Sequence, residues 1–135
     1  MKTTFDVIDT LYPLINVVAI TALLDGRVYR DRKPVDSIKR DIVILSLPIT
    51  GGQDIDLQNC TAIINCHCPD IAPGIPDNVK LRAIATKVIT AIEAYTVGSS
   101  YFNAEINSQL LISDYDQPGM SYVSIRVNCT IQFLP

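Results

Sequence analysis

Cys66, His67 and Cys68 are the residues of this 135-residue sequence whose types and spacing most suggest chemistry, because thiolates and imidazole ligate zinc and serve as catalytic nucleophile and base. In an extended strand, however, Cys66 and Cys68 point to one face and His67 to the other, so the three cannot converge on one ion. The C-x₂-C spacing that turns two thiolates toward a metal is also absent. We therefore interpret them, with Cys60 and Cys129, as small buried thiols and an ordinary histidine. A thiol- or metal-dependent enzyme is kept as a weaker alternative.

No other group of residues forms a recognisable catalytic or binding pattern. His67 is the only histidine, and no G-x-S-x-G turn offers it a serine nucleophile, so we expect it to be exposed or hydrogen-bonded. Gly51-Gly52 lacks the lysine and serine or threonine of a phosphate loop. The i, i+2 carboxylates lack the closing glutamate of a calcium loop; they are Asp54, Asp56, Asp114 and Asp116. The sequence thus predicts a protein that is not an enzyme, with no catalytic residues, no cofactor and no metal.

The balance of charge is acidic, with 11 Lys and Arg against 14 Asp and Glu and a net charge of −3. Proteins that bind nucleic acid usually carry a net basic domain or stripe, because neutralising phosphates supplies much of their affinity. The basic residues here gather in one loop that Asp31, Asp36 and Asp41 interrupt. They are Arg27, Arg30, Arg32, Lys33, Lys39 and Arg40. This pattern predicts a solvated loop or a contact between subunits, and no specific binding of nucleic acid.

The apolar-leaning segment near the N-terminus does not have the composition of a membrane span or a signal sequence. Residues 5–24 include Asp6, Asp9, Pro13 and Asn16. We therefore expect no association with membranes, synthesis in a cytoplasm and reduced cysteines. The length and the 48% hydrophobic content predict a single folded domain over residues 1–135.

The periodicity of apolar residues predicts the elements that carry these residues. Steps of three and four from Phe5 to Ile15 indicate a helix that Thr3 or Thr4 caps, with Pro13 kinking or ending it near Tyr12. A second, stronger helix begins near Asp77 and ends at Gly98. Its apolar stripe is formed by Leu81, Ile84, Ala85, Val88 and Ile92. The predicted strands are residues 27–30, 41–49, 59–68, 104–113 and 121–133.

The order of these elements is α-β-β-β-α-β-β. Hairpin-like spacing predicts an α+β fold, with a mainly antiparallel sheet of about five strands and two helices packed on one face. The last strand alternates apolar and polar residues from Ser121 to Phe133. One face of the sheet should therefore be core, while the other meets water or a partner.

One local pattern, together with this order of elements, resembles the tail-completion or tail-terminator proteins of tailed phages. It consists of Leu11-Tyr12-x-Leu14 in the first helix and the run from Ala22-Leu23-Leu24-Asp25-Gly26 to Arg27-Val28-Tyr29. A loop containing proline, an apolar strand, the helix from Asp77 and a closing hairpin follow. Where those proteins often carry a proline–aromatic pair at the start of the central strand, this sequence has Arg40-Asp41.

The resemblance implies a structural protein of the virion, assembled in the bacterial host cytoplasm and forming a ring, commonly of six copies. Such a ring caps the tail tube and joins it to the head, so the implied partners are copies of the chain, tail-tube proteins and head-connector proteins. We predict that two charged loops carry the contacts between copies, through Arg27, Tyr29, Arg30, Arg32, Lys33, Arg40, Tyr115, Asp116 and Gln117. A cytosolic ligand-binding or adaptor module without catalysis is the alternative.

Overall fold

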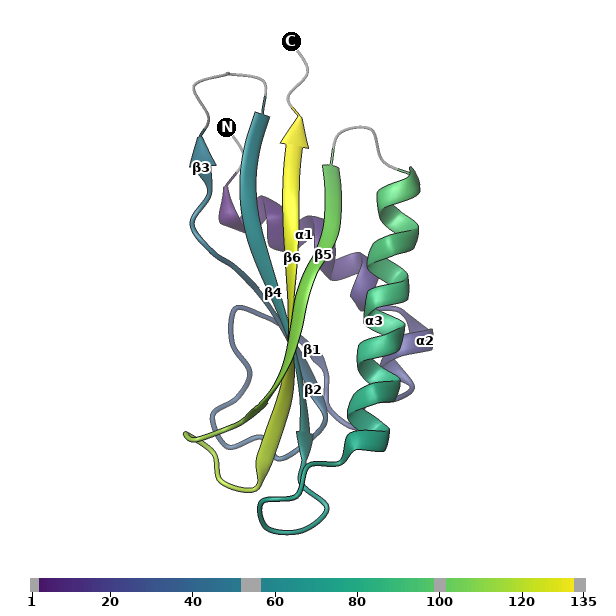
Figure 1. Ribbon diagram of the computed structural model, residues 1–135, viewed down its shortest axis with the longest axis vertical. Helices are drawn as coiled ribbons and strands as arrows, with labels where there is room; N and C mark the ends of the chain where they lie inside the picture. Colours follow the sequence, from purple (N-terminus) through teal and green to yellow (C-terminus); the bar gives the residue numbers. More distant parts are fainter. Residues whose placement is uncertain (1–2, 52–56, 99–101, 133–135) are drawn as a thin grey trace.

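Helices and strands are interleaved along the chain in a computed structural model that describes residues 3–51, 57–98 and 102–132 (Figure 1). The helices are α1 (Thr4–Ile15), α2 (Val18–Thr21) and α3 (Asn78–Gly98). The strands are β1 (Val28–Arg30), β2 (Asp41–Ser46), β3 (Thr50–Gly51), β4 (Leu57–Pro69), β5 (Phe102–Ser113) and β6 (Met120–Gln132). The α+β class is as predicted. The order differs by the short strand β3 and by α2, which lies where one or two further helical turns were expected between Val18 and Leu24. Phe133 lies outside the described residues.

Helix α1 begins as predicted but does not end where proline suggested. The Thr3 hydroxyl accepts a hydrogen bond from the backbone N–H of Asp6, whose side chain bonds back to Thr3 in a capping box. The helix then continues through Pro13 to Ile15, so of the two predicted outcomes, a kink or an end near Tyr12, the end does not occur. Proline removes one backbone hydrogen bond, but Ile15 beyond it is fully buried, and this packing holds the last turn in place.

The sheet has the strand order β1-β2-β4-β6-β5, with β3 added beside β4. The 13-residue strands β4 and β6 pair along their whole length and form its centre. Because β4 and β5 are both antiparallel to β6, they run parallel to each other, and α3 is the crossover between them.

The prediction of a mainly antiparallel sheet needs one correction: the sheet is mixed. Strand β1 pairs with β2 in parallel, with Val28 opposite Ile42 and Arg30 opposite Ile44. Residues 31–40 form this connection, and ten residues are enough to return the chain to the starting end of a strand only three residues long. The hairpin-like spacing assumed from the sequence therefore does not apply to this pair.

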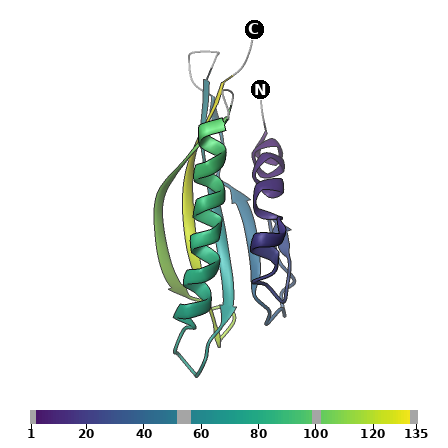
Figure 2. The ribbon, with the colours of Figure 1, turned by 90° about the vertical axis from the view of Figure 1, so that its right-hand side faces the viewer.

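Helices α1 and α3 both pack on the same face of the sheet, which we call the helix face. Figure 2 shows α3 in front of the strands and α1 beside it, toward β1 and β2. The core between these layers is aliphatic. Buried residues of α1 and α3 meet the side chains of Ile42, Ile44, Ile64 and Ile125. The stripe predicted on α3, from Leu81 to Ile92, is buried as expected. None of the described helices is long and apolar enough to cross a bilayer.

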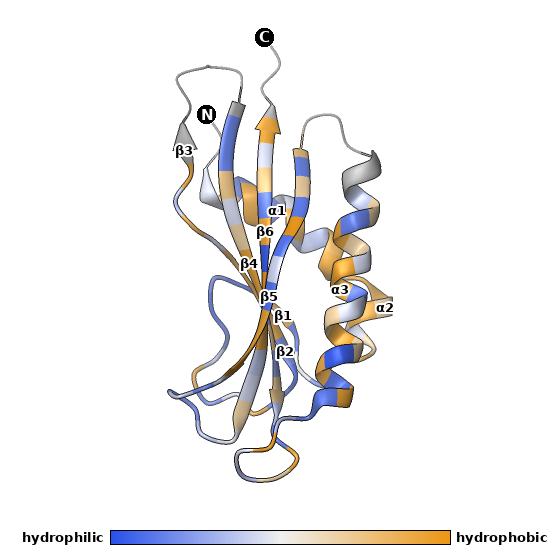
Figure 3. Cartoon of the chain, viewed as in Figure 1, coloured by the Kyte–Doolittle hydropathy of each residue, from blue (hydrophilic) through white to orange (hydrophobic). Residues whose placement is uncertain are grey.

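The opposite side of the sheet, which we call the loop face, carries the alternate residues of the same strands. Register places Asp41, Val43, Asn65, His67 and Tyr122 there. In Figure 1 the connection between β1 and β2 lies on this side, away from α3, and the β5–β6 loop lies below it. Figure 3 shows that the β1–β2 connection is mostly hydrophilic. Part of the loop face is thus covered by a segment with few apolar side chains.

Candidate functional site

The two loops predicted to carry contacts between copies lie against each other on the loop face. Residues 31–40 and 114–119 are joined where the Lys33 ammonium donates to Gln117 Oε1 at 2.8 Å and to the carbonyl of Ser37 at 3.2 Å. Gln117 Nε2 donates to the same Ser37 carbonyl at 2.7 Å. Two segments about eighty residues apart in the sequence therefore form one surface, which we call the loop pair.

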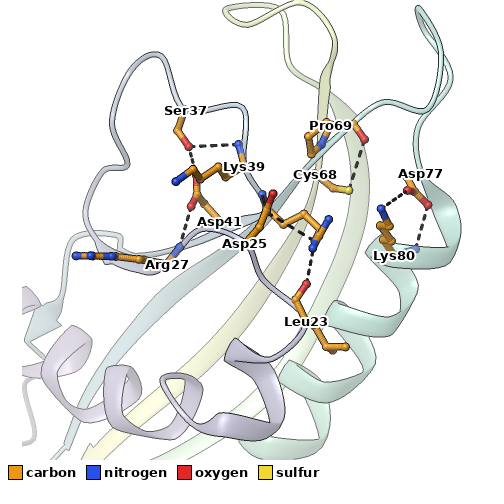
Figure 4. A network of polar contacts seen from close by, with 11 residues as sticks. Leu23, Asp25, Arg27, Ser37, Lys39, Asp41, Cys68, Pro69, Asp77 and Lys80 are labelled. Carbon is orange, nitrogen blue, oxygen red and sulfur yellow. Dashed lines mark hydrogen bonds and ion pairs between the residues drawn. The ribbon is translucent and has the colours of Figure 1, made fainter.

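The buried carboxylate of Asp41 fixes the first of these loops to the sheet. It accepts hydrogen bonds from the backbone N–H of Arg27 at 2.9 Å and from the Ser37 hydroxyl (Figure 4). Gly26 is required beside it, because a Cβ at that position would lie 1.7 Å from Asp41 Oδ1. From the sequence, Asp41 was predicted only as the start of a strand, since nothing in the local pattern distinguishes a buried carboxylate from an exposed one.

Arg40 and Asp25 tie the other end of the loop to the turn before β1. Asp25 Oδ1 accepts from the Arg40 backbone N–H at 2.6 Å, and Arg40 Nε donates to the carbonyl of Leu23 at 2.9 Å. Desolvation on its own would raise the pKa of Asp25. The backbone hydrogen bond and the nearby Arg40 and Lys39 charges outweigh it, so the pKa lies below the ordinary value. Arg40 therefore stabilises its own chain.

Arg30 is likewise engaged within the chain. Its guanidinium lies 3.5 Å from Asp9 and 4.3 Å from the centre of the Tyr12 ring, both on α1. The ion pair is largely exposed and the cation–π contact adds a modest attraction, so together they orient α1 against β1. A substitution of Arg30 would disturb this packing as well as any contact with a partner.

The remaining predicted interface residues are available at the surface. Arg27, Arg32 and Asp116 are exposed, and Tyr115 is 93% exposed, while Tyr29 is half-buried in β1. In Figure 4 the side chain of Arg27 extends away from the network around Asp41. The nine predicted residues thus divide into two groups. Arg30, Lys33, Arg40 and Gln117 build the surface, and the other five present groups that a partner could contact.

His67 lies beneath the loop pair rather than in an active cleft. Its side chain is only 8% exposed, its ring lies 4.9 Å from that of Tyr122, and no described protein group hydrogen-bonds to its Nδ1. Burial and the nearby Lys33 ammonium lower the pKa of His67 to about 4. The expectation of an exposed or hydrogen-bonded histidine was wrong with respect to exposure, since the covering loops come from distant parts of the sequence.

The four cysteines are free and buried, and their side chains lie on the helix face. Cys60 and Cys129 are directly opposite each other on β4 and β6. Burial raises the pKa of Cys66 to about 12, and a hydrogen bond shared with Cys60, with burial, raises that of Cys129. Because thiolates are the reactive form, the Cys66 and Cys129 thiols are poor nucleophiles at neutral pH, whereas the hydrogen bond with Cys129 lowers the pKa of Cys60. Among the described residues no three His, Cys, Asp or Glu side chains are grouped closely enough to hold a metal ion.

Hollows in the surface are open and shallow rather than enclosed. One of about 610 Å³ lies on the part of the loop face that the loops leave bare, and it is lined by both polar and apolar residues, among them Asn59, Asn128 and Leu47. Two smaller ones flank β5 on either side of the sheet. A partly open trough of mixed polarity can contact a large surface or hold a small ligand.

Comparison with known proteins identifies a fold but no family. No family model matches the sequence, and no curated protein matches it. Among solved structures, the chain is similar to one in a structure described as "Virion of native gene transfer agent (GTA) particle", with a TM-score of 0.60 and 12% identity. The match covers 91% of this chain and 92% of the other. The two chains therefore share a fold over nearly their whole lengths.

Proposed function

We propose that this chain is a structural, non-catalytic component of a phage-like virion. In our proposal it forms a ring that terminates the tail tube and joins it to the head. The observation that carries the proposal is the shared fold with a chain of a gene transfer agent virion, over 91% of one chain and 92% of the other. The sequence pattern from Leu11 to Tyr29 independently resembles tail-completion and tail-terminator proteins.

The loop pair supports a role in assembly. Lys33 and Gln117 join two separate loops into one surface, and exposed Arg27, Arg32 and Tyr115 project from it or beside it. Aromatic and arginine side chains on a surface held in place by hydrogen bonds are typical of protein interfaces. The expected partners are further copies of the chain, the tail tube and the head connector.

The acidic net charge is compatible with a channel through which DNA passes. A ring with 14 carboxylates against 11 basic residues per copy should repel the phosphate backbone rather than hold it. Titration with duplex DNA at low salt should show no tight, salt-sensitive binding, and a strong salt-dependent affinity would count against a channel of this kind.

Electron microscopy provides the direct test of the ring. Purified protein, or protein at high concentration, should form closed rings of uniform diameter. Deleting the gene in the genome that encodes it should leave particles with unjoined heads and tubes of uncontrolled length. A protein that stays monomeric at high concentration, together with normal particles after deletion, would refute the proposal.

A charge-reversal variant tests the loop surface within that assembly. The double variant Arg27→Glu/Arg32→Glu removes two exposed basic groups that have no described side-chain partner, so folding should be unchanged while association weakens by tenfold or more. The control Lys80→Glu/Lys87→Glu makes the same change of net charge on α3, where it also removes the exposed ion pair of Lys80 with Asp77, and should leave association unaffected. Equal association by wild type and both variants would exclude Arg27 and Arg32 from the contacts.

A ligand-binding or adaptor module remains the second candidate, and the trough beside Asn59 and Asn128 is the feature that favours it. A ligand-binding module should be a strict monomer, and its melting temperature should rise when a specific small molecule binds. A screen by thermal shift, run alongside the microscopy, separates the two candidates.

A further inference from the structure

The two edges of the sheet differ greatly in length. Strand β5 has twelve residues, forms one edge and, among the described strands, pairs only with β6. At roughly 3.4 Å per residue, its last nine residues, 105–113, present about 30 Å of strand edge. Leu110 and Leu111 on this strand are 63% and 45% exposed, and Figure 3 colours the lower part of β5 as hydrophobic. Long edges with exposed apolar side chains promote pairing with another chain, and monomeric proteins usually protect them.

A shift of register in β5 places one exposed leucine on each side of this edge. The register shifts between Ile106 and Ser108, so that Leu110 lies opposite Ser124 on the loop face and Leu111 opposite Val123 on the helix face. Each leucine borders a hollow. The hollow on the loop face, of about 440 Å³, also includes Ile112, and the one on the helix face, of about 410 Å³, includes Ile89. Alternate side chains of an added strand would enter these two hollows.

The other edge, β1, lies at the matching level of the sheet. Successive register pairs connect Leu110 to Tyr29 in one row across all five strands, through Ser124, Asn65 and Val43. The three residues of β1 are therefore level with residues 109–111 of β5. Because β1 runs parallel to β2, and β2 antiparallel to β4, β1 is also antiparallel to β5. Placed edge to edge without inversion, one copy would present β1 to the next copy's β5 as an antiparallel pair.

The chemistry of the two edges is complementary. Exposed Arg27 and Arg32 flank β1, whereas Glu105 is the only charged residue of β5. The loop that follows β1 lies on the loop face and exposes Val35 and Ile38, at 88% and 71%. These aliphatic side chains lie on the same face as the hollow beside Leu110. The three paired residues cover only about 10 Å of the β5 edge, so Val35, Ile38 and the flank of α3 supply the rest of the contact.

We infer that the occupant of the β5 edge is a second copy of this chain, which adds its β1 edge in antiparallel pairing beside residues 109–111. The inference rests on the proposed ring and specifies its contact. Joining unlike edges is a head-to-tail arrangement, and such arrangements close into rings when the rotation per copy permits. The sheets of neighbouring copies are then continuous around the ring, and Leu110 of one copy faces Tyr29 of the next.

A charge swap across that row tests the pairing. The single variants Leu110→Asp and Tyr29→Lys should each lower the association constant by at least about tenfold, because each places an unpaired charge in the contact. The double variant Leu110→Asp/Tyr29→Lys places opposite charges face to face and should recover most of the loss. Ile71→Asp and Val18→Lys are the matched controls, because both residues are largely exposed, at 70% in the loop after β4 and at 81% on α2. Circular dichroism and thermal melting check that every variant folds, and analytical ultracentrifugation with electron microscopy measures assembly.

The outcomes distinguish this pairing from the wider proposal. Loss in both single variants with recovery in the double supports β1–β5 pairing. Loss in Leu110→Asp alone, with Tyr29→Lys neutral, overturns it, as antiparallel pairing of β5 with a second β5 would give that result. Wild-type rings that persist in both single variants also overturn it while the proposed function stands. If the wild type forms no rings at all, the proposed function fails first, and this inference fails with it.

Discussion

The two faces of the sheet are held in different ways. The helix face is closed by aliphatic packing, in which Ile42, Ile64 and Ile125 are each fully buried. The loop face is closed by a few polar contacts, chiefly those of Asp41 and Gln117, over the buried ring of His67. Apolar burial contributes about 25 cal/mol per Å², whereas a hydrogen bond contributes about 1 kcal/mol net. The helix face should therefore supply most of the stability, and the loop face should shape the surface that partners meet.

A pair of neighbouring isoleucines on β4 gives the largest expected difference. Ile64 is fully buried on the helix face, and Ile63 is half-buried on the loop face. Ile64→Ala leaves a cavity in a layer that cannot easily close and should lower the free energy of unfolding by about 3–4 kcal/mol. Ile63→Ala, the matched control, should cost about 1 kcal/mol. Urea denaturation at pH 7.5 measures both, and equal losses would contradict the proposed division between the faces.

Gly26 tests the polar attachment of the loop face. Gly26→Ala places a Cβ 1.7 Å from Asp41 Oδ1 and 2.8 Å from the carbonyl of Arg40, so the carboxylate or the turn must move. We expect a loss of about 2–3 kcal/mol, in the range for disturbing a buried hydrogen-bonded group. Gly74→Ala is a control with nothing within 4 Å of the added Cβ, although its φ of +75° brings a strain of its own of about 1 kcal/mol. Hydrogen exchange at the Arg27 and Ile42 amides would locate the change. A Gly26→Ala variant as stable as wild type would show that the Asp41 attachment is dispensable.

The pH dependence of stability tests the burial of His67. Its folded pKa of about 4 lies below the ordinary value of 6.5, so the unfolded chain binds the proton more readily between these values. Stability should therefore be constant above about pH 6.5 and fall as the pH drops toward 4. One pKa unit corresponds to 1.36 kcal/mol, which gives about 2 kcal/mol lost at pH 5. His67→Phe keeps an aromatic ring against Tyr122 and should remove this part of the pH dependence. An unchanged slope between pH 6.5 and 5 would mean that His67 is not the group responsible.

Local patterns in the sequence were sufficient to predict the helix face but not the loop face. The stripe from Leu81 to Ile92 and the alternation along β6 were predicted correctly, because burial there follows the period of each element. Three features depend on residues 31–40 folding back over the sheet. They are the parallel pairing of β1, the burial of His67 and the hydrogen bonds of Asp41. That path is set by contacts such as Lys33 to Gln117, between residues 84 positions apart. Contacts between residues so far apart in the sequence cannot be predicted from local patterns.

The register of β5 was missed for a related reason. The sequence predicted a strand over residues 104–113, and in a strand without a bulge Leu110 would share a face with Ala104. The shift between Ile106 and Ser108 reverses that alternation and places Leu110 on the loop face. Residues that tolerate either orientation, such as Asn107 and Ser108, give no hydrophobic signal of where a bulge falls. The sequence alone therefore could not predict that Leu110 and Leu111 lie on opposite faces at the β5 edge; this follows from the pairing of β5 with β6.

The smallest effect is expected at Gln117, which joins the two loops without contributing to the core. Gln117→Ala removes its hydrogen bonds with Lys33 and with the Ser37 carbonyl and should lower the free energy of unfolding by about 1 kcal/mol or less. The local effect should be larger, because the loop pair can open while the helix face remains packed. Amide exchange at Ser37 and Met120 should accelerate by about fivefold, while exchange at Ile64 stays unchanged. Asp116→Ala, in the same loop, is the control and should alter neither. Faster exchange throughout β4 in Gln117→Ala would mean that the loop face and the helix face open together, and the contrast between them would not hold.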